Sequence, residues 1–137
     1  GVVIIRGTAS INSLIQILPK LKDKGPNVKI VAAISMDLFK METKEYQESI
    51  ISVSEWNDSM IITNTSIKLM KKWIKSHFVE AYSMAPDFDD RWRSGGTLDQ
   101  IIAESRLDPS NIWDGIKCFA SERSKRLESM KKEIPDY

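Results

Sequence analysis

Apolar residues in this chain form short continuous runs, separated by longer segments in which they recur every three or four positions. Val2–Ile5 and Val28–Ile34 are two such runs, and Ser59–Thr63 holds a third. Continuous apolar runs of this length predict strands buried on both faces, as in a parallel sheet. Val79–Met84 is predicted to form a fourth strand.

The segment after the first strand has a helical pattern. Its apolar positions would lay one stripe against the sheet, and they are Ile11, Leu14, Ile15, Leu18 and Leu21. Pro19 lies inside this pattern. Because proline lacks a backbone N–H and crowds the preceding turn, we expect a kink or break near Leu18. The first strand, this helix and the second strand form a right-handed unit with the helix on one face of the sheet.

Capping residues predict where later helices begin. Thr43 precedes a helix that reaches about Ile51, and Thr97 precedes a short helix. A short helical turn is expected at residues 37–39. The Asp108-Pro109 pair starts a last helix that continues to about Lys132.

The polar group at residues 64–66 caps a further predicted helix. The core-facing positions expected in these later helices are Tyr46, Ile50 and Ile51, then Ile67, Met70, Ile74 and Phe78, then Leu98, Ile101 and Ile102, and finally Ile112, Ile116, Phe119 and Ala120. Because predicted strands and helices alternate along the chain, the sequence indicates an α/β domain.

The composition of the chain limits the classes of molecule that it is expected to bind. The 137 residues include 20 Lys and Arg against 19 Asp and Glu, a formal net charge of +1. We expect neither nucleic acid nor membrane as a partner, because this balance gives no global field and no apolar run reaches the roughly 18–20 residues that span a bilayer. The start of the sequence lacks a signal-peptide pattern, which favours a cytoplasmic location. The single cysteine, Cys118, cannot form an internal disulfide.

The most unusual chemistry lies in a long irregular stretch at residues 85–96. Asp87, Asp89 and Asp90 stand beside Arg91-Trp92-Arg93. Metal binding is disfavoured, because the arginines would pair with the acids and the spacing is not that of a calcium loop. Arg91 and Arg93 are candidates for binding an anion or a phosphosugar. The favoured interpretation is an interface loop anchored by Trp92, since Trp and Arg are enriched where partners dock.

Other candidate sites have plainer explanations. The turn at residues 7–10 joins a strand to a helix, where phosphates bind in some folds, but it lacks the spacing of a phosphate-binding motif. A glycine is needed at Gly7 simply to turn the chain. His77, the only histidine, is expected late in a helix as a C-terminal cap. Cys118 lies in an amphipathic helix without a visible activating group. Most of the four tryptophans are expected in the core.

Several segments of the first 51 residues resemble one known domain. The strand and turn at residues 4–10, the valine-rich strand leading through Ser35 to Leu38-Phe39, and the segment containing Glu45-Tyr46 follow one another in the order and spacing of the C-terminal domain of transketolase-type enzymes. The chain therefore resembles that domain, closely at the start and more loosely to its end. A related parent, such as the first component of a 2-oxoacid dehydrogenase, remains an alternative, as does an independent small-molecule or partner-binding α/β module.

This resemblance carries expectations about the fold and the division of labour. It implies one domain over residues 1–137, cut from a longer chain, with a three-layer α/β/α fold and a mostly parallel mixed sheet of about five strands. In that family, thiamine diphosphate and a divalent metal are held between two preceding domains of a homodimer. The resemblance therefore implies a non-catalytic, dimer-organising domain with no catalytic, cofactor-binding or metal-binding residues of its own, inside a parent that transfers two-carbon ketol units between sugar phosphates.

Overall fold

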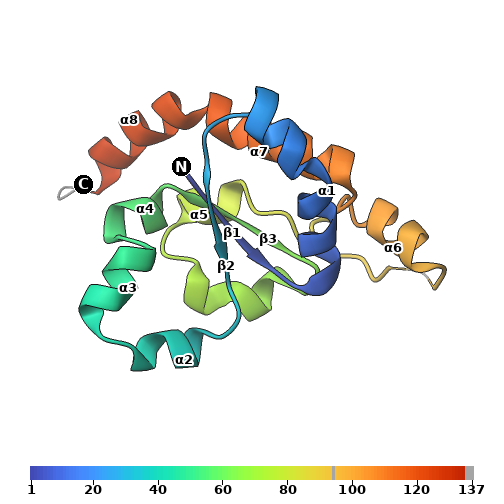
Figure 1. Ribbon diagram of the computed structural model, residues 1–137, viewed down its shortest axis with the longest axis horizontal. Helices are drawn as coiled ribbons and strands as arrows, with labels where there is room; N and C mark the ends of the chain where they lie inside the picture. The colour runs from blue at the N-terminus through green and yellow to red at the C-terminus, as the bar shows by residue number, and fades with distance from the viewer. Residues whose placement is uncertain (94, 135–137) are drawn as a thin grey trace.

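A parallel sheet of three strands forms the centre of the computed structural model, which describes residues 1–93 and 95–134 (Figure 1). The strands are β1 (Val2–Arg6), β2 (Lys29–Ala32) and β3 (Ser59–Thr63), in the order β2-β1-β3. Ile4 in β1 lies opposite Val31 on one side and Ile61 on the other. The predicted α/β class is confirmed. Within the described residues the sheet has neither the antiparallel strand nor the five strands expected.

Helices make up most of the remaining chain. They are α1 (Thr8–Lys24), α2 (Met36–Met41), α3 (Lys44–Ile50), α4 (Val53–Asn57), the 3₁₀ helix η1 (Ile67–Trp73), α5 (His77–Ala81), α6 (Leu98–Glu104), α7 (Pro109–Ser121) and α8 (Arg123–Glu133). The side chains of Thr43, Thr97 and Asp108 cap α3, α6 and α7 as predicted. Such caps can be recognised in the sequence because each one satisfies backbone N–H groups only two or three residues away.

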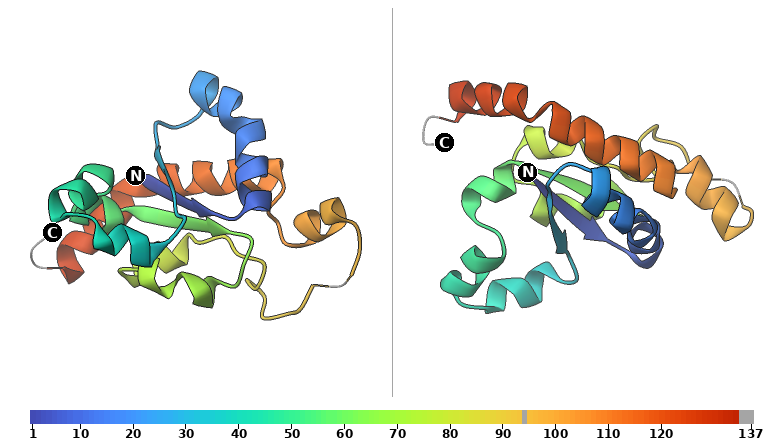
Figure 2. Two further views of the ribbon diagram at one scale, coloured as in Figure 1. Left: turned by 60° about the horizontal axis from the view of Figure 1, so that its bottom comes forward. Right: turned by 45° about the horizontal axis from the view of Figure 1, so that its top comes forward.

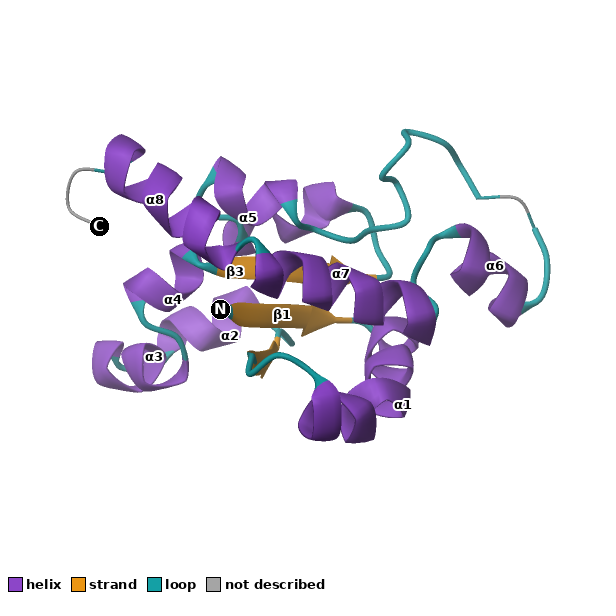
Figure 3. Ribbon diagram, turned by 90° about the horizontal axis from the view of Figure 1, so that it is seen from above, coloured by secondary structure: helices purple, strands orange, loops and turns teal. Residues whose placement is uncertain are grey.

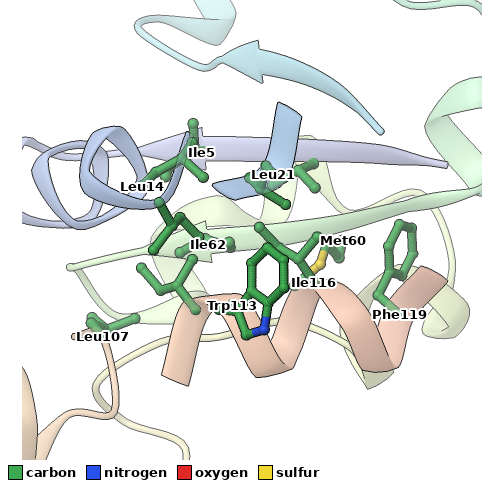
Figure 4. Close-up of a cluster of buried hydrophobic side chains, with 12 residues drawn as sticks. Ile5, Leu14, Leu21, Met60, Ile62, Leu107, Trp113, Ile116 and Phe119 are labelled. Carbon is green, nitrogen blue, oxygen red and sulfur yellow. The ribbon is translucent and has the colours of Figure 1, made fainter. Parts of the chain in front are cut away.

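The two faces of β1 bury different sets of side chains. Val3 and Ile5 join a cluster with residues of α1 and α7, whereas Val2 and Ile4 join a second cluster with residues of α2, η1 and α5. Figure 4 shows the first cluster, in which α7 side chains point toward the strands, and Figure 3 shows α7 lying along the sheet. The continuous β-branched run of β1 follows from burial on both faces.

Strand β2 departs from the sequence prediction. It is shorter than the predicted Val28–Ile34 strand, and Val31 is its only buried residue. Ile34, predicted within the strand, follows it and is 82% exposed. The prediction of burial on both faces was wrong because β2 is an edge strand of the described sheet, and an apolar run alone does not distinguish an edge from the centre.

The predicted fourth strand was also wrong. Residues 77–81 form α5, whose N-terminal turn is closed by the carbonyl of Ser76 accepting from the backbone N–H groups of Val79 and Glu80. Only Met84 reaches the sheet, through an isolated parallel bridge to Ile62. Phe78 and Val79 are buried, but they pack from a helix. Short apolar runs fit a strand and a buried helical turn equally well.

Helix α1 runs through Pro19 without the predicted break. Pro19 and Ile15 are both exposed, so water can bond to the Ile15 carbonyl that loses its helical partner. The buried face is also rotated from the predicted stripe. Ile15 and Leu18 are 54% and 39% exposed, whereas Ile17 is buried.

Three other helical predictions need correction. Tyr46, expected to face the core, is 49% exposed, although Ile51 is buried. The helix expected after residues 64–66 is divided into η1 and α5. The last predicted helix is divided at Glu122 into α7 and α8. As predicted, α7 buries Ile112, Ile116 and Phe119, but α8 buries Arg126 as well as Met130.

No helix among residues 1–93 and 95–134 has the length and apolar character needed to cross a membrane.

Candidate functional site

A cavity of about 540 Å³ lies beside the ends of β1 and β3. One wall comes from Ala9 in the first turn of α1 and from the segment Asn64–Ser66 that follows β3. The other walls come from the loop before α6 and from α6 itself. Figure 3 shows the arrowheads of β1 and β3 directed toward the side of the molecule that carries α6, and Figure 2 shows α6 at one end of the fold.

The sheet order explains why the chain opens at this place. From β1 the chain crosses through α1 to β2 on one side, and it later returns to β3 on the other side. The loops that leave β1 and β3 therefore diverge, and a crevice forms outside the carboxyl ends of the two strands. In open parallel sheets this switch point is where ligands bind.

The turn after β1 depends on Gly7. Its φ of 97° lies in the left-handed region, and a Cβ at this position would overlap the Asn64 Oδ1 atom. Glycine is therefore required both by conformation and by the close approach of the loop after β3. This outcome supports the structural interpretation of the turn, since Gly7 brings the two strand ends together.

The polar wall of the cavity is an organised network. The Thr65 backbone N–H donates to Thr63 Oγ1 at 3.1 Å, and Ser66 Oγ donates to Asp87 Oδ2 at 2.6 Å. Asp87 Oδ1 also accepts from the Ile67 N–H at 3.1 Å. Burial acts to raise the pKa of Asp87, but these hydrogen bonds outweigh it and the pKa is lowered. Asp87 therefore ties the loop before α6 to the start of η1.

The predicted loop residues have three different environments. The Arg93 side chain is only 9% exposed, and its Nε and Nη2 donate to the Pro86 carbonyl at 2.8 and 2.5 Å. Arg93 also pairs with Asp89 and lies over the Phe88 ring, 4.8 Å from its centroid. Its guanidinium thus braces the loop from inside.

Arg91 and Trp92 face solvent instead. The Arg91 side chain is 72% exposed and pairs with Asp89 through Nε at 2.9 Å, and Trp92 is 98% exposed. Burial acts to raise the pKa of Asp89, but hydrogen bonds from Arg91 and Arg93 lower it to about 2. All three predicted residues line the cavity, and their proposed interface or anion-binding role stays a prediction.

The apolar wall of the cavity was not predicted from the sequence to be part of a site. Leu98, Ile101 and Ile102 of α6 line the cavity together with Leu107. Their apolar spacing predicted a helix, but it gave no sign that this helix faces the loop at residues 86–93. The available signal was topological, because segments that follow neighbouring parallel strands meet at one edge of the sheet.

Two other candidates lie outside the cavity lining. His77 was predicted near the C-terminal end of a helix, but it is the first residue of α5. Its Nε2 lies 3.4 Å from Glu133 Oε2. Cys118 is exposed on α7. In the described part of the chain, no group of three His, Cys, Asp or Glu side chains could hold a metal ion.

Comparison with known families and curated proteins finds no relative of this chain. No model of a known protein family matches the chain, and no curated protein matches it. The resemblance to the transketolase C-terminal domain therefore depends on the segments at residues 4–51 described above.

Proposed function

We propose that this chain is a non-catalytic α/β domain of a transketolase-type enzyme, corresponding to the C-terminal domain of such a parent. Two observations support the proposal: the ordered segments within residues 4–51, and the α/β fold with a parallel sheet. The three-layer, five-stranded arrangement belongs to the proposal. So do the transfer of two-carbon ketol units by the parent, the location of thiamine diphosphate and metal in its other domains, and the homodimer.

One observation carries the structural role. Six large apolar side chains between residues 30 and 53 are exposed, namely Ile30, Ile34, Leu38, Met41, Tyr46 and Val53. Ile34 and Met41 are each 82% exposed and Val53 is 72% exposed. Exposed apolar side chains that form one contiguous patch mark a place where another protein surface packs, and we propose that these six residues form such a patch. We call these six residues the edge surface, because they begin at the edge strand β2 and continue through α2 and α3 to α4.

The position of the edge surface fits packing against another domain. In Figure 1, α2 and α3 lie on the side of the sheet opposite to α7 and α8. The edge surface also lies largely within the segment that resembles the transketolase domain. A domain that covers these side chains in the parent would remove them from water, which stabilises the interface by about 25 cal/mol for each Å² of apolar area buried.

The identity of the parent is tested directly in its gene. We expect the reading frame to continue upstream of the Gly1 codon into a thiamine-diphosphate motif, Gly-Asp-Gly followed by Asn-Asn. The isolated chain should neither bind thiamine diphosphate in calorimetry nor convert ketose phosphates. Tight binding or turnover by this chain alone would overturn the proposed division of labour.

The structural role has its own test in the parent enzyme. Met41→Lys places a charge in the edge surface and should weaken domain packing or dimerisation, seen as a smaller mass in light scattering and a lower melting temperature. Lys40→Met is the matched control, since it changes the neighbouring residue of α2 in the opposite sense. Unchanged assembly in Met41→Lys would contradict a packing role for the edge surface.

A second candidate function is an independent small-molecule-binding module. The cavity at the ends of β1 and β3 is the observation that favours it. A stop codon followed by a native start near Gly1 would support this alternative over the first proposal.

A further inference from the structure

We propose that the cavity beside β1 and β3 binds a small organic anion that carries a flat apolar ring. This inference does not depend on a transketolase parent, because it comes from the cavity and from the sheet order. The volume of about 540 Å³ lies within the range of roughly 300–1,000 Å³ that is usual for small-molecule sites. Its position is the switch point of the parallel sheet, where the loops after β1 and β3 diverge.

The apolar wall defines one half of the ligand. Ile101 and Ile102 are half-buried in α6, Leu107 is 2% exposed, and Leu98 at the outer rim is 66% exposed. Trp92 also lines the cavity, with almost all of its side chain in solvent. A flat ring placed between Trp92 and α6 would cover apolar area on both sides, and offset ring pairs add about 0.5–1.5 kcal/mol to the gain from burial alone.

The polar wall defines the other half. Lys68 lines the cavity, and within residues 1–93 and 95–134 no carboxylate lies close enough to form an ion pair with its ammonium group, although its charge helps to lower the pKa of Asp87. Asn64, in the segment that follows β3, also lines the cavity, and its buried Oδ1 has no hydrogen-bond partner within the described residues. Lys68 can bind a carboxylate or phosphate oxygen through its positive charge, and the unpartnered Asn64 Oδ1 can accept a hydrogen bond from a ligand hydroxyl, such as the protonated oxygen of a phosphate monoester.

The other charged residues that line the cavity explain why we assign the contact with the anion to Lys68 and not to the arginines. Arg93 already donates to Pro86 and pairs with Asp89, and Arg91 also pairs with Asp89. Asp87 accepts hydrogen bonds from the start of η1, which leaves Asp90 as an exposed carboxylate at the rim. Asp90 should repel the anion, so Asp90→Asn should tighten binding.

The test uses 1-naphthyl phosphate as the probe, with the neutral 1-naphthol and inorganic phosphate as its two halves. We expect saturable binding of 1-naphthyl phosphate to the full chain in calorimetry, with amide NMR shifts concentrated at residues 64–66 and 98–102. Each half should bind at least tenfold more weakly. Equal binding by 1-naphthol would overturn the anion part, and equal binding by inorganic phosphate would overturn the ring part.

Matched variants separate this site from general effects. Lys68→Gln should weaken binding about tenfold, as expected for the loss of one charge-assisted contact, whereas Lys71→Gln on the same 3₁₀ helix should not. Leu98→Asp should weaken binding, whereas Leu69→Asp, at a residue of equal exposure outside the cavity lining, should not. Equal loss in both members of either pair, or no binding of the probe, would overturn the proposal. Either result leaves the transketolase proposal to its own test in the gene.

Discussion

Two aspartates in this protein each lie between two arginines, but in different surroundings. Asp58 accepts from Arg123 Nε at 2.6 Å and from Arg126 at 2.7 and 3.0 Å. Asp89 accepts from Arg91 Nε at 2.9 Å and pairs with Arg93. The first group joins residues 65 and 68 positions apart, whereas the second spans five consecutive residues of one loop.

Burial decides what each group does. The Arg126 side chain is fully buried between the rings of Tyr82 and Phe119, with centroids 4.8 and 3.9 Å away, and the Asp58 side chain is 4% exposed. Asp89 is 23% exposed and Arg91 is 72% exposed. A buried charge left without its partner is strongly destabilising, while an exposed pair contributes little. The same residue types therefore fasten α8 to the end of α4 in one place and shape a surface loop in the other.

The largest expected effect comes from breaking the buried group. Asp58→Asn leaves Arg126 buried without a carboxylate, which should lower the free energy of unfolding by about 3–5 kcal/mol. Urea denaturation followed by circular dichroism measures this. Asp89→Asn is the matched control, and it should lower the same free energy much less, because solvent reaches this carboxylate and its Arg91 partner. Equal losses in the two variants would contradict the role assigned to burial.

Lowering the pH should distinguish the group around Asp58 from the group around Asp89 in a second way. Burial acts to raise the pKa of Asp58, but hydrogen bonds from Arg126 and Arg123 outweigh it and hold the pKa below its ordinary value of 3.8. The ionised carboxylate therefore stabilises the fold fully above about pH 4, and this stabilisation is lost as pH falls through the lower pKa of the folded state.

Asp58→Asn should accordingly lose less stability than the natural chain when pH is lowered from about 5 to 2. Denaturant midpoints measured across that range test this difference. Asp89, with its pKa of about 2, should give a change of the same sign that is smaller because solvent screens the pair. If the denaturant midpoints of Asp58→Asn and of the natural chain fell by the same amount across this pH range, the prediction would be contradicted.

A smaller effect is expected inside the loop itself. Arg93→Ala removes the donors to the Pro86 carbonyl and should cost about 1–2 kcal/mol in unfolding free energy. It should also speed hydrogen exchange at residues 86–92, because the brace of the loop is lost. Exchange that stays as slow as in the natural chain would count against this bracing role.

The smallest effect is expected at Arg91. Arg91→Ala should change the unfolding free energy by less than about 0.5 kcal/mol, since its pair with Asp89 is exposed. Arg91→Ala and Arg93→Ala each remove one arginine from the same carboxylate, that of Asp89. The difference between their unfolding free energies, measured under identical conditions, therefore compares an exposed arginine with a buried one. A larger loss in Arg91→Ala than in Arg93→Ala would reverse the assignment of roles.

Local signals in the sequence predicted much of the fold. β3 was predicted with its correct ends, and the caps at Thr43, Thr97 and Asp108 were correct because their hydrogen bonds reach only three residues along the chain. The residues 79–84 were wrongly predicted as a strand, since their apolar run has no feature that separates a strand from a helical turn. The exposed edge of β2 was missed because strand order is a property of the whole chain.

The candidate site shows the same limit. The sequence singled out Arg91, Trp92 and Arg93 because they are adjacent, and all three do line the cavity. It did not connect them with Lys68 or with α6, which only the fold brings near. The Asp58 and Arg126 pair escaped notice altogether, because no local pattern links residues so far apart.

The nearly complete exposure of Trp92 has an optical consequence. Trp73 and Trp113 are 4% and 9% exposed and Trp56 is half-buried, so a dissolved quencher such as iodide reaches the Trp92 indole first. The fluorescence of this chain therefore contains a quenchable component that comes from the rim of the cavity. Any molecule or protein surface that covers Trp92 should protect that component from iodide and move its emission to shorter wavelength.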